Sequence, residues 1–330
     1  MHIGTSEIVI FCSFLLFISL MLGIDLGIFN KRSHSLSFRE ALAWTSVWVG
    51  ISVLFYIGIR LFGHKLHGLD TLDAIQSKID AFNHPIRIAG LALDKAIDLY
   101  NQNLALEYLT GYLIEYSLSV DNIFVIIMIF LSFNIQSRYY KKVLFWGILG
   151  AVVMRFLFIF VASALIQHFA WFLYLFGFLL LILGGKMAWE FFSSKKKKKI
   201  DPDKHPVVRF ISRLFAVTKE ERGNKFWVRE NGKIMMTPLF IVLLIVELSD
   251  VLFAVDSVPA VFSVTRDPYI VFFSNIFAIL GLRSLFFLVM NVMNMFRYLK
   301  LGLAFLLSFV GLKMLIHFPL SSRSTFGIII

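Results

Sequence analysis

Two segments, EYSLSVDNIFVIIMIF at residues 115–130 and ELSDVLFAVDSVPAVF at residues 247–262, carry carboxylates inside runs that are apolar enough to cross a bilayer. A charge at the bilayer centre costs at least about 2.5 to 3.5 kcal/mol on insertion scales, so these acids need counter-ions, protons or a bound cation. We predict an intramembrane cation site, with structural ion pairing as the alternative. Its candidate metal ligands are Glu115, Asp121, Glu247, Asp250 and Asp256.

The composition is that of a polytopic membrane protein. Of the 330 residues, 58% are hydrophobic and 16% are charged, whereas charged residues make up about a quarter of a soluble domain. We predict an all-α fold of about eight transmembrane helices, because runs of about 20 apolar residues recur along the chain. These runs lie near 7–29, 43–63, 106–132, 143–166, 169–191, 238–263, 269–292 and 299–318.

The net charge of +11 is unevenly distributed among the loops. Of the 32 Lys and Arg residues, 21 lie in the loops after the first, third, fifth and seventh spans, and six lie in the other loops and the C-terminal tail. The positive-inside rule then places those four loops in the cytoplasm and the N-terminus outside. The basic run at 195–199 is expected to meet lipid headgroups. The predicted partners are therefore the lipid bilayer and a metal ion, not nucleic acid, and nothing in the sequence identifies a protein partner.

The predicted organisation has six segments. The outer loop is expected to hold two short amphipathic helices separated at Pro85, and the inner loop two extended pieces around Asn231-Gly232. The segments are two N-terminal spans at 1–63, an extracytoplasmic loop at 64–104, a first three-helix repeat at 105–192, a basic cytoplasmic loop at 193–236, a second three-helix repeat at 237–318, and a tail or the start of a last span at 319–330.

The second half of the chain resembles the first. SVDN at 119–122 aligns with AVDS at 254–257, and two further matches follow in the same order, one of which pairs Arg155 with Arg283. Each repeat unit contains three spans, and because three is odd, the second unit enters from the opposite side of the membrane. Inverted repeats of this kind are typical of secondary transporters, whose substrate sites lie near the midplane.

The ligand types indicate a hard cation. The acids are accompanied by possible secondary ligands, Asn122, Ser257 and Asn275, and by Arg155 and Arg283 as charge balance. Oxygen ligands suit Mg²⁺, Ca²⁺ or Mn²⁺, whereas Zn²⁺ and copper prefer His and Cys. Na⁺ and H⁺ remain open alternatives. We predict a transported cation and no covalently bound cofactor.

Helix geometry leaves two ways to arrange the acids. In an unbroken helix, Glu115 and Asp121 lie about 120° apart. Either two helix faces are lined, or the helix is interrupted near the second acid. Pro259 favours an interruption in the second copy, because it cannot donate a hydrogen bond to the carbonyl four residues earlier.

Enzymatic function is not expected. The single cysteine, Cys12, allows no internal disulfide. The spans also contain no Ser/His, Cys/His or His-zinc arrangement of the kind that supports catalysis.

The motifs YLIEYSLSVDNIFV, ELSDVLFAVDSVPAVF and DPYIVFFSNIFAILGLRSLFFLV resemble the TerC family of integral membrane proteins, in particular its Alx-like branch. The resemblance implies a multi-pass protein of the bacterial cytoplasmic membrane with nine spans. It also implies manganese efflux, although tellurium-resistance and redox-modulator descriptions are common in the family. The alternatives are a Ca²⁺ or Na⁺/H⁺ antiporter and a non-transporting membrane scaffold.

Reporter fusions at His168 and Lys197 test the inverted unit. The predicted topology places these residues on opposite sides of the membrane, because one span separates them. We therefore expect a periplasmic reporter to be active at His168 and a cytoplasmic reporter at Lys197. Activity of the same reporter at both positions would contradict the three-span inverted unit.

Overall fold

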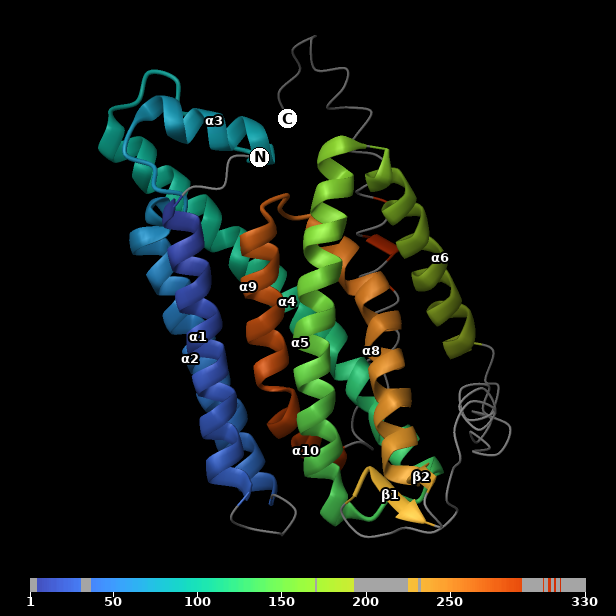
Figure 1. The fold of residues 1–330 in the computed structure, drawn as a ribbon. Coiled ribbons are helices and arrows are strands. Elements are labelled where there is room, and N and C mark those ends of the chain that lie inside the picture. The colour runs from blue at the N-terminus through green and yellow to red at the C-terminus, as the bar shows by residue number, and fades with distance from the viewer. Residues whose placement is uncertain are drawn as a thin grey trace.

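The computed structural model describes residues 5–30, 37–169, 171–192, 225–230 and 233–292, together with isolated positions between 305 and 315. It is a helical bundle with one small β-hairpin (Figure 1). In chain order the elements are α1 Thr5–Asn30, α2 Phe38–Leu66, α3 Leu72–Phe82, α4 Leu93–Ser132, α5 Ser137–His168, α6 Phe172–Phe192, β1 Trp227–Glu230, β2 Lys233–Met236, α8 Pro238–Phe262, α9 Pro268–Leu280 and α10 Leu282–Val292.

The predicted all-α membrane class is confirmed. Within the described residues, α2, α4, α5 and α8 are long and apolar enough to cross a membrane, and the bent pair of α9 and α10 can form a fifth span. The helices α1 and α6 also coincide with predicted spans. The predicted span at 299–318 lies outside the continuously described residues, so the total of eight and the inverted repeat stay predictions.

Local sequence signals explain where several helices begin and end. Ser37 accepts a hydrogen bond from the backbone of Glu40, and the Glu40 carboxylate accepts one in return, forming a capping box at the start of α2. The Thr71 side chain caps α3 by accepting a hydrogen bond from the Ala74 backbone N–H, and Asn83 ends that helix in the left-handed region with φ of 55°. Asparagine tolerates this conformation better than most residues.

One predicted helix of the outer loop is not separate. The first, α3, is confirmed, but the second merges into α4, which starts at Leu93 and continues unbroken for 40 residues. The expected stop between the loop helix and the span does not exist, because no proline interrupts the segment and its buried face continues through Ala96, Tyr100 and Leu104. The helix α4 therefore extends beyond the apolar segment that we predicted to begin at residue 106.

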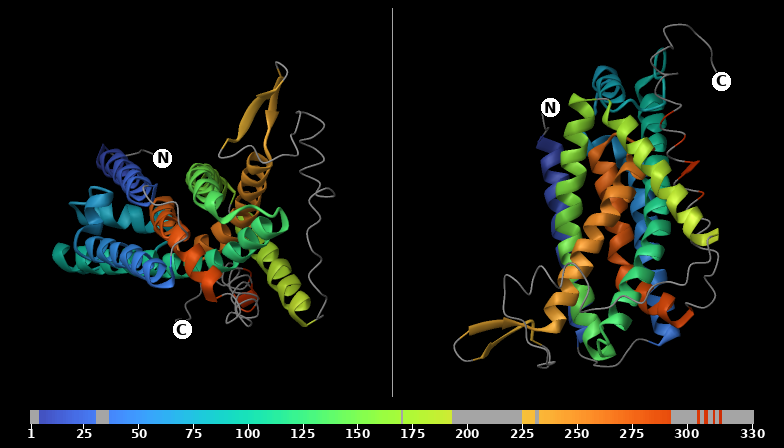
Figure 2. Two further views of the ribbon diagram at one scale, coloured as in Figure 1. Left: turned by 90° about the horizontal axis from the view of Figure 1, so that it is seen from below. Right: turned by 90° about the vertical axis from the view of Figure 1, so that its right-hand side faces the viewer.

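The predicted extended pieces around Asn231-Gly232 are confirmed as an antiparallel hairpin. Trp227 pairs with Met236, and Glu230 pairs with Lys233. The hairpin lies at the end of the bundle opposite α3 and projects sideways from it (Figures 1 and 2). We refer to the two ends of the bundle as the α3 end and the hairpin end.

The centre of the bundle is occupied by α9. All 13 of its residues are buried, as expected for a helix that is apolar on every side. It packs against α4 and α5 and lies next to α1 and α2 (Figure 2). Aromatic contacts fasten α1 to it, since the Phe14 and Phe273 ring centroids are 4.4 Å apart. This central helix brings its polar residues into the core of the molecule.

A bend separates α9 from α10. The two helix axes differ in direction by 47°, and Gly281 lies between them, where an added Cβ would stand 3.3 Å from the Cβ of Trp48 in α2. The bend turns α10 toward α2 and α4 at the hairpin end of the bundle.

Gly111 of α4 lies close to side chains of α8 and α9, and its replacement tests the packing there. An added Cβ would lie 2.9 Å from Ser274 Oγ and 3.0 Å from Val261 Cγ1. We expect Gly111→Ala to lower the melting temperature in detergent, because overpacking costs about 1 to 3 kcal/mol and exceeds the gain in helix propensity of about 1 kcal/mol.

The matched control is Gly58→Ala in α2, where an added Cβ meets no atom within 4 Å. This variant gains the helix propensity without the overlap, so its melting temperature should equal or exceed that of the wild type. Equal effects of the two substitutions would contradict close packing at Gly111.

Candidate cation site

A buried arginine forms the centre of the candidate site. Arg155 lies near the middle of α5 and its side chain is inaccessible to solvent. Its Nη1 atom forms an ion pair with Glu115 of α4 and donates a hydrogen bond to Asn275 Oδ1 of α9 at 2.6 Å. Its Nη2 atom lies 3.8 Å from Asp250 Oδ1 of α8. Charged and polar groups from four helices therefore meet at one point inside the bundle.

The neighbours of Arg155 are held in place by their own helices. Asn275 donates its amide N–H to the Val271 carbonyl one turn earlier, at 2.9 Å, which directs Oδ1 toward the guanidinium. Ser119 donates to Glu115 Oε1 at 3.4 Å from one turn further along α4. Both contacts follow from the spacing of four residues, which places side chains on the same helix face.

The acids of α8 lie close to this centre. Glu247 and Asp250 are three residues apart and share one face of the helix. The Glu247 carboxylate packs against α5 at Gly150, where any Cβ would overlap it. Gly150 precedes Arg155 by five residues, so Glu247 contacts α5 about 7.5 Å along the helix axis from Arg155.

Two carboxylate oxygens of the site have no hydrogen-bond donor among the described residues. They are Oε2 of Glu115, which is fully buried, and Oδ2 of Asp250, whose side chain is 15% exposed. Buried polar atoms are normally satisfied, so such atoms call for an explanation in terms of function, water or an ion. Both oxygens are available as ligands for a cation.

The other predicted site residues lie away from Arg155, or their side chains are not among those that the structure describes. Asp121 and Asn122 are half-buried in α4, and Asp121 is six residues, about 9 Å, further along the axis than Glu115. Ser257 is fully buried. Arg283 is buried in the first turn of α10, which packs against α2 and α4. The side chain of Asp256 is not among those that the structure describes.

The five predicted acids are therefore not seen as one cluster. Among the described side chains, no three His, Cys, Asp or Glu residues are grouped closely enough to hold a metal ion. A site formed by all five acids stays a prediction.

The predicted interruption of the second acidic helix is wrong. The helix α8 continues through Pro259 to Phe262, and α4 is unbroken as well. Pro259 lies in the last turn of α8, so the lost hydrogen bond affects only a helix end. The chain bends at Gly281 instead, so the alternative in which the acids line two helix faces is the one compatible with the described helices.

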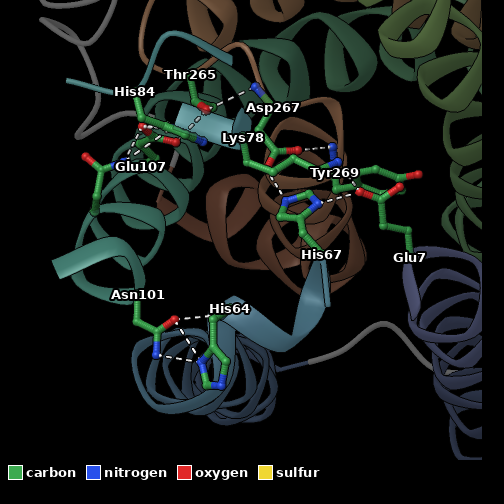
Figure 3. A network of polar contacts seen from close by, with 11 residues as sticks. Glu7, His64, His67, Lys78, His84, Asn101, Glu107, Thr265, Asp267 and Tyr269 are labelled. Carbon is green, nitrogen blue, oxygen red and sulfur yellow. Dashed lines mark hydrogen bonds and ion pairs between the residues drawn. The ribbon is translucent and has the colours of Figure 1, made fainter. Parts of the chain in front are cut away.

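A second charged cluster, at the α3 end, was not predicted. His67 directly follows α2 and is fully buried between two carboxylates: its Nδ1 lies 2.7 Å from Glu7 Oε1 of α1, and its Nε2 lies 2.9 Å from Asp267 Oδ2 at the start of α9 (Figure 3). Lys78 of α3 reaches the same Glu7 oxygen at 2.5 Å. This cluster joins α1, α2, α3 and α9.

A neighbouring group extends the cluster to α4. His84 Nδ1 lies 2.8 Å from Glu107 Oε1, and Thr265 donates to Glu107 Oε2 at 2.6 Å (Figure 3). Asn103 donates to the same glutamate at 2.7 Å. The sequence signal for this group was the presence of histidines in the outer loop together with Asp267 before Pro268, a helix-start pattern.

The charges of the cluster at the α3 end support one another. Burial alone would lower the pKa of His67, but the Coulombic attraction and hydrogen bond of Asp267 and the hydrogen bond of Glu7 outweigh it, so the pKa is raised. Burial would likewise raise the pKa of Asp267, yet the charge and hydrogen bond of His67 lower it. The favoured state is a protonated histidine between two carboxylates.

These features together define an integral membrane protein with a charged centre inside its helical bundle. The chain belongs to the TerC family of integral membrane proteins, since residues 100–329 match that family. Its curated relatives place it on the Alx-like branch.

The relatives are similar over most of their length. The chain is 40% identical to a protein of Escherichia coli K12 named Alx and described as a membrane-bound redox modulator, over 96% of this chain and 90% of the relative. It is 40% identical to the Alx protein of Photorhabdus laumondii, over 93% and 87%. An uncharacterized membrane protein of Myxococcus xanthus is 39% identical, over 93% and 83%. No solved structure shows a significant match.

The cluster at the α3 end gives a pH-dependent contribution to stability. A raised pKa for His67 means that its contribution is complete below the ordinary value of 6.5 and is lost as the pH rises through the raised value. We expect the melting temperature of the wild type in detergent to fall as the pH rises above about 6.5, and that of His67→Gln to change less over the same range.

The control is His64→Gln, which removes a histidine of α2 that lies one turn before His67 and bonds Asn101 of α4. This variant should keep the pH dependence of the wild type. A wild-type melting temperature that does not change with pH across this range would contradict a charged His67.

Proposed function

We propose that this protein exports divalent cations, with Mn²⁺ preferred, from the cytoplasm across the bacterial cytoplasmic membrane. In this proposal the N-terminus and the α3 end face outward. The observation that carries the proposal is the charged centre within the bundle, where Arg155 of α5 pairs with Glu115 and lies 3.8 Å from Asp250, while Glu247 packs against Gly150 of the same helix. The family resemblance supports manganese among the possible cations.

The charge and chemistry of this centre suit a divalent cation. Three carboxylates and one guanidinium have a formal charge of −2 when all are ionised. A divalent ion would neutralise that charge, and its ligands would be oxygens, which Mg²⁺, Ca²⁺ and Mn²⁺ prefer. Intramembrane acids that face a bundle interior commonly mark ion pathways.

The position of the centre supports a transport site. Arg155 and Asp250 each lie close to the middle of their helices, which in this proposal puts their side chains near the bilayer midplane, where the substrate sites of secondary transporters are found. In the proposed mechanism, Glu247 and Asp250 of α8 receive the cation and Glu115 of α4 completes its binding.

A non-transporting scaffold is the second candidate, because Arg155 already neutralises Glu115. In that case the acids serve to stabilise the bundle and bind no ion. A redox role, which the names of the relatives suggest, would have to work without an internal disulfide, since the chain has one cysteine. Catalysis is not proposed.

Uptake of ⁵⁴Mn²⁺ into inside-out membrane vesicles, with and without a pH gradient, tests export directly. We expect uptake by the wild type, and we expect Asp250→Asn to reduce it at least about tenfold, because even indirect supports of metal ligands affect affinity by 10 to 100-fold. The same assay with Asp121→Asn and Asp256→Asn tests the two acids that the repeat alignment pairs.

The matched control is Asp98→Asn, which removes an exposed acid of α4 that pairs with Arg60. Exposed ion pairs contribute little, so this variant should transport as the wild type does. Normal membrane abundance with full ⁵⁴Mn²⁺ uptake in Asp250→Asn, Asp121→Asn and Asp256→Asn would show that these acids do not carry the function. Absence of uptake by the wild type, with Ca²⁺ or Na⁺ transported instead, would favour the antiporter.

A further inference from the structure

The position of Arg155 relative to the acids has a functional meaning beyond charge balance. The guanidinium contacts Glu115 of α4 on one side and stands 3.8 Å from Asp250 of α8 on the other. A cation that bridges these two carboxylates would occupy the same region. A positive group of the protein itself therefore lies where the proposed substrate would bind.

We propose that the Arg155 guanidinium is a tethered competitor of the transported cation. It neutralises Glu115 while the site is empty and moves away from that carboxylate when a divalent cation binds. The proposal rests on the proposed function, since it needs a cation that enters this centre. Arg155 would then set both the affinity of the site and the ease of cation release.

The contacts of the guanidinium are unequal, which allows stepwise displacement. Glu115 is in direct contact with Nη1, whereas 3.8 Å between Nη2 and Asp250 exceeds hydrogen-bond range. Arg155 and Asp250 thus do not form the bidentate pair that makes arginine–carboxylate contacts strongest. Asp250 can engage a cation before the contact with Glu115 is broken.

The exposure of the acids supports the same order of cation binding, with the acids of α8 before Glu115. Glu247 is half-buried, Asp250 is 15% exposed, and Glu115 is fully buried. In this proposal an incoming cation engages the two acids of α8 first and Glu115 last. Asp250 and Glu115 each keep one buried oxygen without a hydrogen-bond donor among the described residues, which the cation would use as a ligand.

Competition by a tethered group weakens cation binding. A group held next to its partner has a high effective concentration, on the order of millimolar or above, so an incoming ion must displace it. Without such a competitor, buried carboxylates could hold a divalent cation too tightly to release it. Removing the guanidinium should therefore tighten binding while it destabilises the empty protein, because the acids lose their counter-ion.

The experiment compares Mn²⁺ binding to the purified full chain in lipid nanodiscs by calorimetry, together with melting temperatures in the presence and absence of Mn²⁺. We expect Arg155→Gln to bind Mn²⁺ about tenfold more tightly than the wild type, within the usual range of coupling between two sites. Its melting temperature without metal should be lower, and Mn²⁺ should raise it more than it raises that of the wild type.

Chemical rescue separates competition from general effects of the substitution. In Arg155→Ala, millimolar guanidinium chloride should lower the Mn²⁺ affinity back toward that of the wild type. Sodium chloride of the same ionic strength should not. Arg60→Ala removes an arginine from an exposed ion pair with Asp98 and should bind Mn²⁺ as the wild type does. Arg155→Lys retains the charge without the planar fork, so it should bind Mn²⁺ more tightly than the wild type but less tightly than Arg155→Gln.

The outcomes distinguish this proposal from the proposed function. No Mn²⁺ binding by the wild type or any variant overturns both. Binding by the wild type, with equal or weaker binding by Arg155→Gln and no effect of guanidinium on Arg155→Ala, overturns the competitor alone and assigns Arg155 a structural role. If the uncharged variants do not fold, Arg155→Lys decides, and binding no tighter than that of the wild type overturns the proposal.

Discussion

The arrangement of the bundle depends on the ion pair between Arg155 and Glu115. Both side chains are buried among apolar helices, and loss of one partner in such a pair typically destabilises a protein by about 3 to 5 kcal/mol. The pair links α4 to α5, and the hydrogen bond to Asn275 adds α9 to the same point. The apolar surfaces allow many ways of packing these helices, whereas the charged contacts permit few.

Much of the fold was predictable because hydropathy and turn chemistry are local properties of the sequence. The apolar runs located the described spans, and Asn231-Gly232 located the hairpin. Glu115 and Asp250 were identified because they are acids in spans where packing alone would favour apolar residues. The sequence also offered Arg155 as charge balance, and the structure shows which of the acids it contacts.

The unpredicted features depend on distant pairings or on context. His67 meets partners 60 and 200 residues away in the chain, and no local pattern announces such contacts. Pro259 suggested a break in α8, but it lies in the last turn, so the missing hydrogen bond affects only the end of the helix. The continuity of the second loop helix with the span in α4 was missed, because hydropathy marks the membrane boundary, whereas a helix continues until a residue stops it.

The unbroken lengths of α4 and α9 connect the two charged clusters. Glu107 and Glu115 lie eight residues apart on α4, and Asp267 and Asn275 lie eight residues apart on α9. Eight residues of helix correspond to about 12 Å. The two clusters therefore lie at two levels along the same pair of helices, α4 and α9, which pack against each other. If α4 or α9 slides or rotates as a rigid helix, its side chains in both clusters shift together.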